Sequence, residues 1–171
     1  MKKILWAVIA TMCVAPAAMA QADTAQVTKP EGYQFTDTKV LPTTPIKNQA
    51  QSGTCWSFAG IALLENELLR MGKPEYDLSE MWIVRHCYLD KLVRFVRYHG
   101  KTEFAGGGGV IDVPYVAVKY GLVPEEVYAG LNYGEKKHNH NELDAVMRAY
   151  AEAVVSGKKP TTAWLNGAAS I

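Results

Sequence analysis

One stretch decides the fold, and it runs from Thr44 to Gly60 with the sequence T-P-I-K-N-Q-A-Q-S-G-T-C-W-S-F-A-G. Apolar residues then recur at helical spacing, so Cys55 is predicted to lie at the N-terminus of a helix. Unpaired amide N–H groups and the positive end of the helix dipole favour an anion there, and the thiolate is the nucleophilic form of cysteine. Gln49 supplies an NH2 group that can donate to an oxyanion beside the backbone N–H of Cys55. The pattern predicts a nucleophile and an oxyanion donor on one segment.

A single cysteine is more often a small buried hydrophobic residue than a nucleophile, but the length of this pattern favours the nucleophile. Thr44 to Ala59 closely resembles the active-site segment of papain-like cysteine peptidases, in which Q-x-x-x-G-x-C-W-x-F-A is preceded by T-P-[VI]-K-N-Q. The resemblance implies that Cys55 is the nucleophile and Gln49 the oxyanion-hole glutamine. Trp56 corresponds to the aromatic residue that follows the nucleophile, and we expect it to contribute to substrate binding.

Two features indicate a branch within that family. Many secreted papain-like enzymes carry a disulfide-bonded cysteine three residues before the nucleophile, where this chain has Ser52. The short extended leader at residues 21–43 leaves no room for a long inhibitory propeptide. Both features resemble the bleomycin hydrolase or aminopeptidase C branch.

Residues 1–20 have the organisation of a secretory signal peptide. Lys2 and Lys3 precede an apolar core, and Ala18-Met19-Ala20 forms a small-residue cleavage site. The alternative is an uncleaved membrane anchor, but the apolar run is shorter than the roughly 20 residues that span a bilayer. We expect an exported protein, in a bacterial periplasm or outside the cell, with no stable membrane span after signal cleavage.

Composition narrows the function further. The 171 residues are 49% hydrophobic and 20% charged, which is typical of one globular domain. Cleavage of the signal would remove two of the 18 basic residues and none of the 17 acidic residues, which leaves no basic excess for a nucleic-acid partner. Cys55 and Cys87 would remain, and with Cys55 as nucleophile Cys87 is expected to be free and buried on a helix.

Helices are predicted at about 54–71, 80–99, 112–120 and 142–155 from apolar periodicity and stop signals. The second begins after the capping residues Asp77-Leu78-Ser79, and its polar positions are expected to face solvent. These positions are Arg85, Lys91, Arg94 and Arg97. The resemblance implies that residues 44–157, which contain these helices, are the helical half of a papain-like peptidase domain.

Four consecutive glycines stand at Gly106–Gly109. Glycine lets a backbone approach a ligand closely, and an extended peptide can pair with such an edge as an added strand. Papain-like peptidases have a Gly-Gly pair at a fixed distance before x-Y-G, and counting back from Tyr120-Gly121 places it at Gly107 and Gly108. The resemblance implies that these two glycines bind the substrate backbone.

The expected fold class is α+β, a papain-like peptidase of which this chain supplies mainly the helical left-hand domain. The family's His and Asn follow the Cys by about 130–150 residues, in a second, β-rich domain beyond Ile171. Residues 158–171 stay unassigned, and we expect a truncated chain. His138 and His140 form at most half a metal site, so neither a metal nor a cofactor is predicted.

Two functions are carried forward. The first is a cysteine-type peptidase, an aminopeptidase or endopeptidase acting on a peptide substrate. The second is a non-catalytic peptide-binding half-domain, or a fragment that needs a second, His-bearing domain. Two protein partners are considered: a second copy of this chain, in a homo-oligomer, and the missing second domain.

Overall fold

The computed structural model describes residues 32, 33, 35–132, 134–157 and 159–171, so the predicted signal peptide lies outside the described residues. The chain divides into two units, Met1–Thr38 and Lys39–Ile171. The described part of the first unit has no regular secondary structure, and Tyr33 and Phe35 there are exposed. No helix in the described part has the length and hydrophobicity that a membrane span requires.

The second unit contains five helices in its described residues. They are α1 (Cys55–Arg70), α2 (Glu80–Arg97), α3 (Asp112–Tyr120), α4 (Asn141–Ser156) and α5 (Ala163–Ser170). The four helices predicted from the sequence are confirmed to within two residues at their ends, and α5 was not predicted. Extended pairing in the described residues amounts to two isolated bridges, so the helical part of the predicted α+β fold is the part observed.

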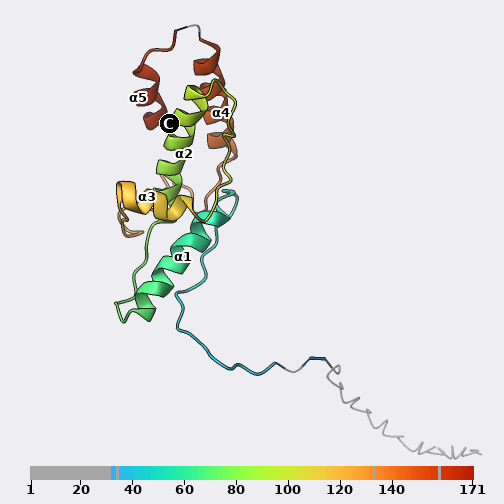
Figure 1. Cartoon of the computed structure of the whole chain (residues 1–171), viewed down its shortest axis with the longest axis vertical. Coiled ribbons are helices and arrows are strands. Elements are labelled where there is room, and N and C mark those ends of the chain that lie inside the picture. Colours follow the sequence, from blue (N-terminus) through green and yellow to red (C-terminus); the bar gives the residue numbers. More distant parts are fainter. Residues whose placement is uncertain (1–31, 34, 133, 158) are drawn as a thin grey trace, which may run out of the picture. The chain divides into compact units, whose positions relative to one another are not determined.

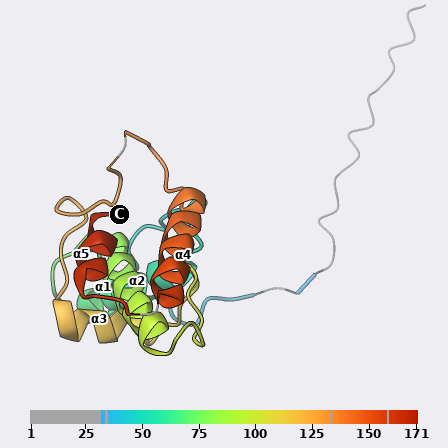
Figure 2. The same cartoon turned by 90° about the horizontal axis from the view of Figure 1, so that it is seen from above.

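Helix α2 is the centre of this unit, because it contacts each of the other four helices. Figures 1 and 2 show α4 and α5 on two sides of α2, with α1 and α3 near its N-terminal end. Its buried side chains are mostly apolar and lie at helical spacing: Met81, Ile83, Val84, Cys87, Tyr88, Leu92 and Phe95. Cys87 is a free, buried thiol, as expected.

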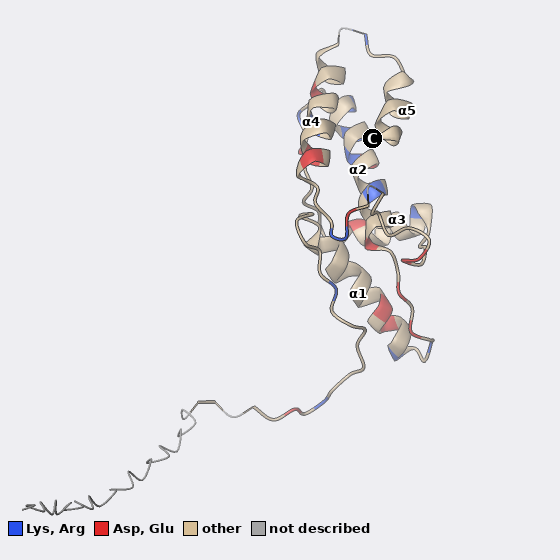
Figure 3. Cartoon of the chain, turned by 180° about the vertical axis from the view of Figure 1, so that it is seen from behind, with Lys and Arg blue, Asp and Glu red and all other residues tan. Residues whose placement is uncertain are grey.

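Local chemistry sets the helix ends. Ser79 caps α2, since its side chain accepts a hydrogen bond of 2.9 Å from the backbone N–H of Trp82. Helix α1 ends before Gly72, which adopts a φ of +72° that glycine reaches without strain. Acidic residues gather in the C-terminal half of α1 (Figure 3), where Glu65 and Glu67 lie.

Helices α1 and α3 approach closely at a glycine. A Cβ placed on Gly60 would lie 2.5 Å from Cγ2 of the buried Val113, so only glycine allows this separation. The contact brings the segment before α3, which contains the four glycines, to the N-terminal end of α1.

Candidate active site

Cys55 is the first residue of α1, and its side chain is exposed. The carbonyl of Thr54 accepts hydrogen bonds from the N–H groups of Ser57 (2.9 Å) and Phe58 (3.3 Å), which closes the first turn. The N–H groups at the very start of a helix have no intrahelical acceptor. The backbone N–H of Cys55 is therefore available to a ligand beside the sulfur.

The loop that leads into Cys55 is held by short-range hydrogen bonds. The Asn48 side chain accepts from the N–H of Ala50 at 2.8 Å, and Ala50 adopts a φ of +52°. The Ser52 hydroxyl donates to the carbonyl of Gln49 at 2.8 Å. Ser52 is buried. Its hydrogen bond stabilises the loop at the position where many secreted papain-like enzymes carry a disulfide-bonded cysteine.

Gln49 is half-buried, on the same loop as Cys55. Its Oε1 atom is buried and has no hydrogen-bond partner in the described part of the chain. A buried polar atom without a partner is uncommon in a folded protein and calls for an explanation. The assignment of Gln49 as oxyanion donor stays a prediction, and the structure places it on the segment that this role requires.

The glycine loop, Gly106–Gly109, lies against Trp56. The indole Nε1 donates a hydrogen bond of 3.0 Å to the carbonyl of Gly106, across 50 residues of sequence. A Cβ on Gly108 would lie 2.5 Å from Cε2 of the same indole, whereas a Cβ on Gly107 would meet nothing within 4 Å. The structure therefore brings the predicted substrate-binding glycines beside the residue that follows Cys55.

Lys47 anchors the loop before Cys55 through ion pairs with three acidic residues. Its ammonium lies 2.9 Å from Glu80, 3.3 Å from Glu65 and 2.6 Å from Asp77. Although burial alone lowers the pKa of Lys47, hydrogen bonds to Asp77 and Glu80 raise it above its ordinary value. The site segment is thus tied to both α1 and α2 through one cation.

Residues 138–140 form a strap over the same loop. The N–H of Gln51 donates to the carbonyl of His138 at 3.0 Å, and the N–H of His140 donates to the carbonyl of Gln51 at 3.1 Å. The His138 ring lies 6.4 Å from that of Phe58, and the His140 ring 6.5 Å from that of Tyr88. Burial lowers the pKa of both imidazoles, which favours their neutral form.

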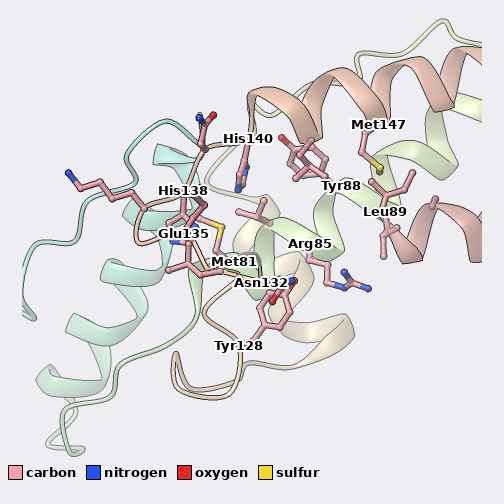
Figure 4. A pocket seen from close by; sticks show the side chains of 18 residues that line it. Met81, Arg85, Tyr88, Leu89, Tyr128, Asn132, Glu135, His138, His140 and Met147 are labelled. Atoms are coloured by element: carbon pink, nitrogen blue, oxygen red, sulfur yellow. The ribbon is translucent and has the colours of Figure 1, made fainter.

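Both histidines line a cavity of about 200 Å³ along α2 (Figure 4). Met81, Tyr88 and Met147 form part of its wall. None of the residues predicted for catalysis or substrate binding lines this cavity. Among the described residues, no group of three or more His, Cys, Asp or Glu is arranged to hold a metal ion.

Two residues important to this geometry were missed by the sequence analysis. Lys91 was expected to be available to solvent; it is half-buried, and from an exposed position its ammonium also donates to the carbonyl of Gly107, a contact that was not predicted. Lys47 was noted only as part of the T-P-I-K-N-Q pattern. Their long-range partners carry no local sequence signature, because each contact depends on how the helices pack.

Comparison with known proteins identifies the family. The model of the papain family of cysteine proteases matches residues 29–165. The chain therefore belongs to the papain family of cysteine proteases, and the resemblance found in the sequence is confirmed.

Individual relatives agree with this assignment. The chain is 27% identical over 155 residues to "Cysteine proteinase 1, mitochondrial" of Saccharomyces cerevisiae, an alignment that covers 79% of this chain and 32% of the yeast protein. It is 34% identical over 85 residues to human "Cathepsin L2", covering 50% and 23% of the two chains. "Peptidase 1" of Psoroptes ovis is also 34% identical over 85 residues, covering 50% and 22%. The chain spans about a third of the length of the yeast relative.

Proposed function

We propose that this chain carries the nucleophile half of a cysteine-type peptidase. The Cys55 thiolate attacks the carbonyl carbon of a peptide bond, and the amine leaves with a proton, so that a thioester to Cys55 forms. Water then cleaves the thioester, releasing the carboxylate and restoring the thiol. The backbone N–H of Cys55 and the side-chain NH2 of Gln49 stabilise the oxyanion formed in each step.

One observation carries this proposal: the glycine loop lies across the indole of the residue directly after Cys55. Gly106 accepts from Trp56, Gly107 accepts from Lys91, and Gly109 donates to Asp112. Among the hydrogen bonds of the described residues, none uses the N–H or the carbonyl of the exposed Gly108. An extended peptide that paired with Gly108 would lie alongside the start of α1.

Thiol catalysis also needs an imidazole and a group that orients it. We assign these to a second, β-rich domain, which would complete an α+β papain-like fold. His138 and His140 are less suitable, since their rings pack beside Phe58 and Tyr88 and line the cavity along α2. This distribution favours a second candidate function, a peptide-binding half-domain that hydrolyses peptides only with a His-bearing partner.

The test compares the full chain with its Cys55→Ala and Cys87→Ala variants on short fluorogenic peptide amides. With the second, His-bearing domain supplied, we expect cleavage by the wild type and by Cys87→Ala, and a loss of about a thousandfold or more in Cys55→Ala. Peptide binding without cleavage, equal in wild type and Cys55→Ala, would support the half-domain instead. Cleavage that survives in Cys55→Ala would contradict the peptidase assignment.

We also propose the branch of the family and the export of the protein from the cell. The similarity to the yeast cysteine proteinase, together with Ser52, supports the bleomycin hydrolase or aminopeptidase C branch. The signal-like residues 1–20 support export, whereas the yeast relative is named mitochondrial. N-terminal sequencing of the mature protein tests export, since removal of residues 1–20 would leave Gln21 as the first residue.

A further inference from the structure

The glycine loop has three anchors, and one of them comes from the middle of α2. Trp56 binds the carbonyl of Gly106, and Asp112 binds the N–H of Gly109 at 2.8 Å. Between them, the ammonium of Lys91 donates to the carbonyl of Gly107. Lys91 therefore acts on the peptide unit that joins Gly107 to Gly108.

That peptide unit is planar and trans, since the described chain contains no cis peptide bond. In a trans peptide the C=O and the following N–H point in opposite directions. Because Lys91 draws the Gly107 carbonyl toward α2, the N–H of Gly108 must point away from α2. The direction of this N–H decides whether an added strand can pair with the loop.

Lys91 also contacts the other side of the site. Its Nζ atom lies 5.5 Å from the centroid of the Trp56 ring, within the range of a cation–π interaction. One ammonium thus links the glycine loop to the residue after Cys55. A hydrogen bond from a charged donor to a carbonyl is stronger than one between neutral groups. A glycine-rich backbone has many accessible conformations, and a strong hydrogen bond from Lys91 can hold it in one of them.

We propose that Lys91 is a positioning residue, which orients the Gly107–Gly108 peptide unit so that the N–H of Gly108 can pair with an extended peptide beside Cys55. This role rests on the proposed function, because it assumes that peptides reach Cys55 along the glycine loop. Lys91 touches neither the reacting sulfur nor the oxyanion donors in this arrangement. It acts through Gly108.

The experiment compares two reagents that alkylate the same sulfur. Iodoacetamide has no peptide portion, whereas a dipeptidyl chloromethyl ketone presents an extended backbone. The ratio of their rate constants at Cys55, followed by intact mass and peptide mapping, reports recognition of the backbone. A change in the exposure or ionisation of Cys55 affects both reagents and cancels in the ratio.

Three variants of the full chain are compared with the wild type. Lys91→Met keeps the aliphatic stem and removes the ammonium, and Lys91→Arg restores a cationic donor. Lys73→Met is the matched control, since Lys73 is exposed and follows the opposite end of α1 from Cys55. We expect the ratio to fall about tenfold in Lys91→Met, to recover at least partly in Lys91→Arg, and to stay unchanged in Lys73→Met.

The outcomes separate the role of Lys91 from the proposed function. A wild-type preference for the peptidyl reagent that survives in Lys91→Met overturns the positioning role alone. A wild type with no preference overturns peptide binding along the loop and the role of Lys91 with it. If Lys91→Met has a lowered melting temperature but an unchanged ratio, Lys91 is only a structural contact and the proposal is wrong.

Discussion

Gly108 and Trp56 are packed so closely that a single added carbon at Gly108 would overlap the indole. The ideal Cβ position lies 2.5 Å from Cε2 and 2.6 Å from Cδ2 of the ring. Trp56 is buried, so the ring cannot move into solvent without losing its packing. The contact fixes the distance between the glycine loop and the first turn of α1.

This contact predicts the effect of Gly108→Ala. We expect the free energy of unfolding to fall by about 2 kcal/mol, since overpacking displaces a buried ring. Gly107→Ala is the matched control, because a Cβ there meets nothing within 4 Å. Its free energy of unfolding should change by no more than about 0.5 kcal/mol. Urea unfolding of both variants checks the difference, and equal midpoints would contradict the packing argument.

The two cysteines of the described chain should differ in reactivity. Burial raises the pKa of the Cys87 thiol to about 11, so only about one molecule in ten thousand carries the thiolate at pH 7. Cys55 is exposed. We expect iodoacetamide at pH 7 to modify Cys55 at least about a hundredfold faster than Cys87. Peptide mapping measures both rates, and the gap should close in denaturant.

Lys47 is expected to be essential for stability. Glu65 and Glu80, with side chains 2% and 5% exposed, would lose their cation in Lys47→Met. Breaking such a buried network costs about 3 kcal/mol. Lys119→Met is the control, since Lys119 pairs with Asp90 at a more exposed site and should lower stability much less. Equal losses of melting temperature in the two variants would count against the network.

Glu125 should make stability depend on pH. Burial and the nearby Glu80 carboxylate raise the pKa of Glu125 from 4.5 to about 7, and its Oε2 atom has no partner in the described residues. Between these two pH values the folded state keeps a proton that the unfolded state has lost. The contribution of Glu125 to stability is therefore full below about pH 4.5 and disappears as the pH rises through about 7.

Glu125→Gln should remove this dependence. We expect the variant to exceed the wild type by about 1 kcal/mol in free energy of unfolding at pH 8, and to match it at pH 4. Glu126→Gln at the exposed neighbouring position serves as the control. Chemical unfolding at both pH values provides the measurement, and a difference that is the same at pH 4 and pH 8 would exclude Glu125 as its source.

Helix α3 presents an apolar stripe that should promote self-association. Ile111, Tyr115, Val118 and Leu122 are all exposed along α3 and its flanks, with Val118 90% exposed. Exposed apolar patches of this kind drive association in water. We expect Val118→Lys to reduce the weight-average mass in sedimentation relative to the wild type. An unchanged mass, or a wild type that sediments as a monomer at all concentrations, would contradict this.

Much of the helical architecture was predictable because its determinants are local. Apolar periodicity located α1 and α2, and Ser79 and Gly72 marked a helix start and a helix end. The central position of α2 was not predictable, since it depends on which faces pack together. Helix α5 was missed because its eight residues make only about two turns, which is too short for a helical period to stand out.

In the candidate site, too, the residues in local sequence patterns were predicted, and the contacts that depend on helix packing were not. Cys55, Gln49 and Trp56 were found from one contiguous pattern, and the structure places them on one loop and helix start. Gly107 and Gly108 were found by counting from Tyr120, and Gly108 packs against Trp56. Lys91 was predicted to face solvent because helical periodicity describes only the average polarity of a face. This periodicity gave no indication that the carbonyl of Gly107 would accept a hydrogen bond from Lys91.

The strap between Gln51 and residues 138–140 can form only late in the synthesis of the chain. Its two hydrogen bonds close a loop of nearly ninety residues, so they form only after the chain has been made through His140. Contacts of such long range are entropically costly and form late in folding. During synthesis, the loop before Cys55 therefore lacks this strap until His140 has been added, and until then only its local hydrogen bonds and the ion pairs of Lys47 can hold it. The nucleophile is made early, and the last restraint on its loop comes from a segment made much later.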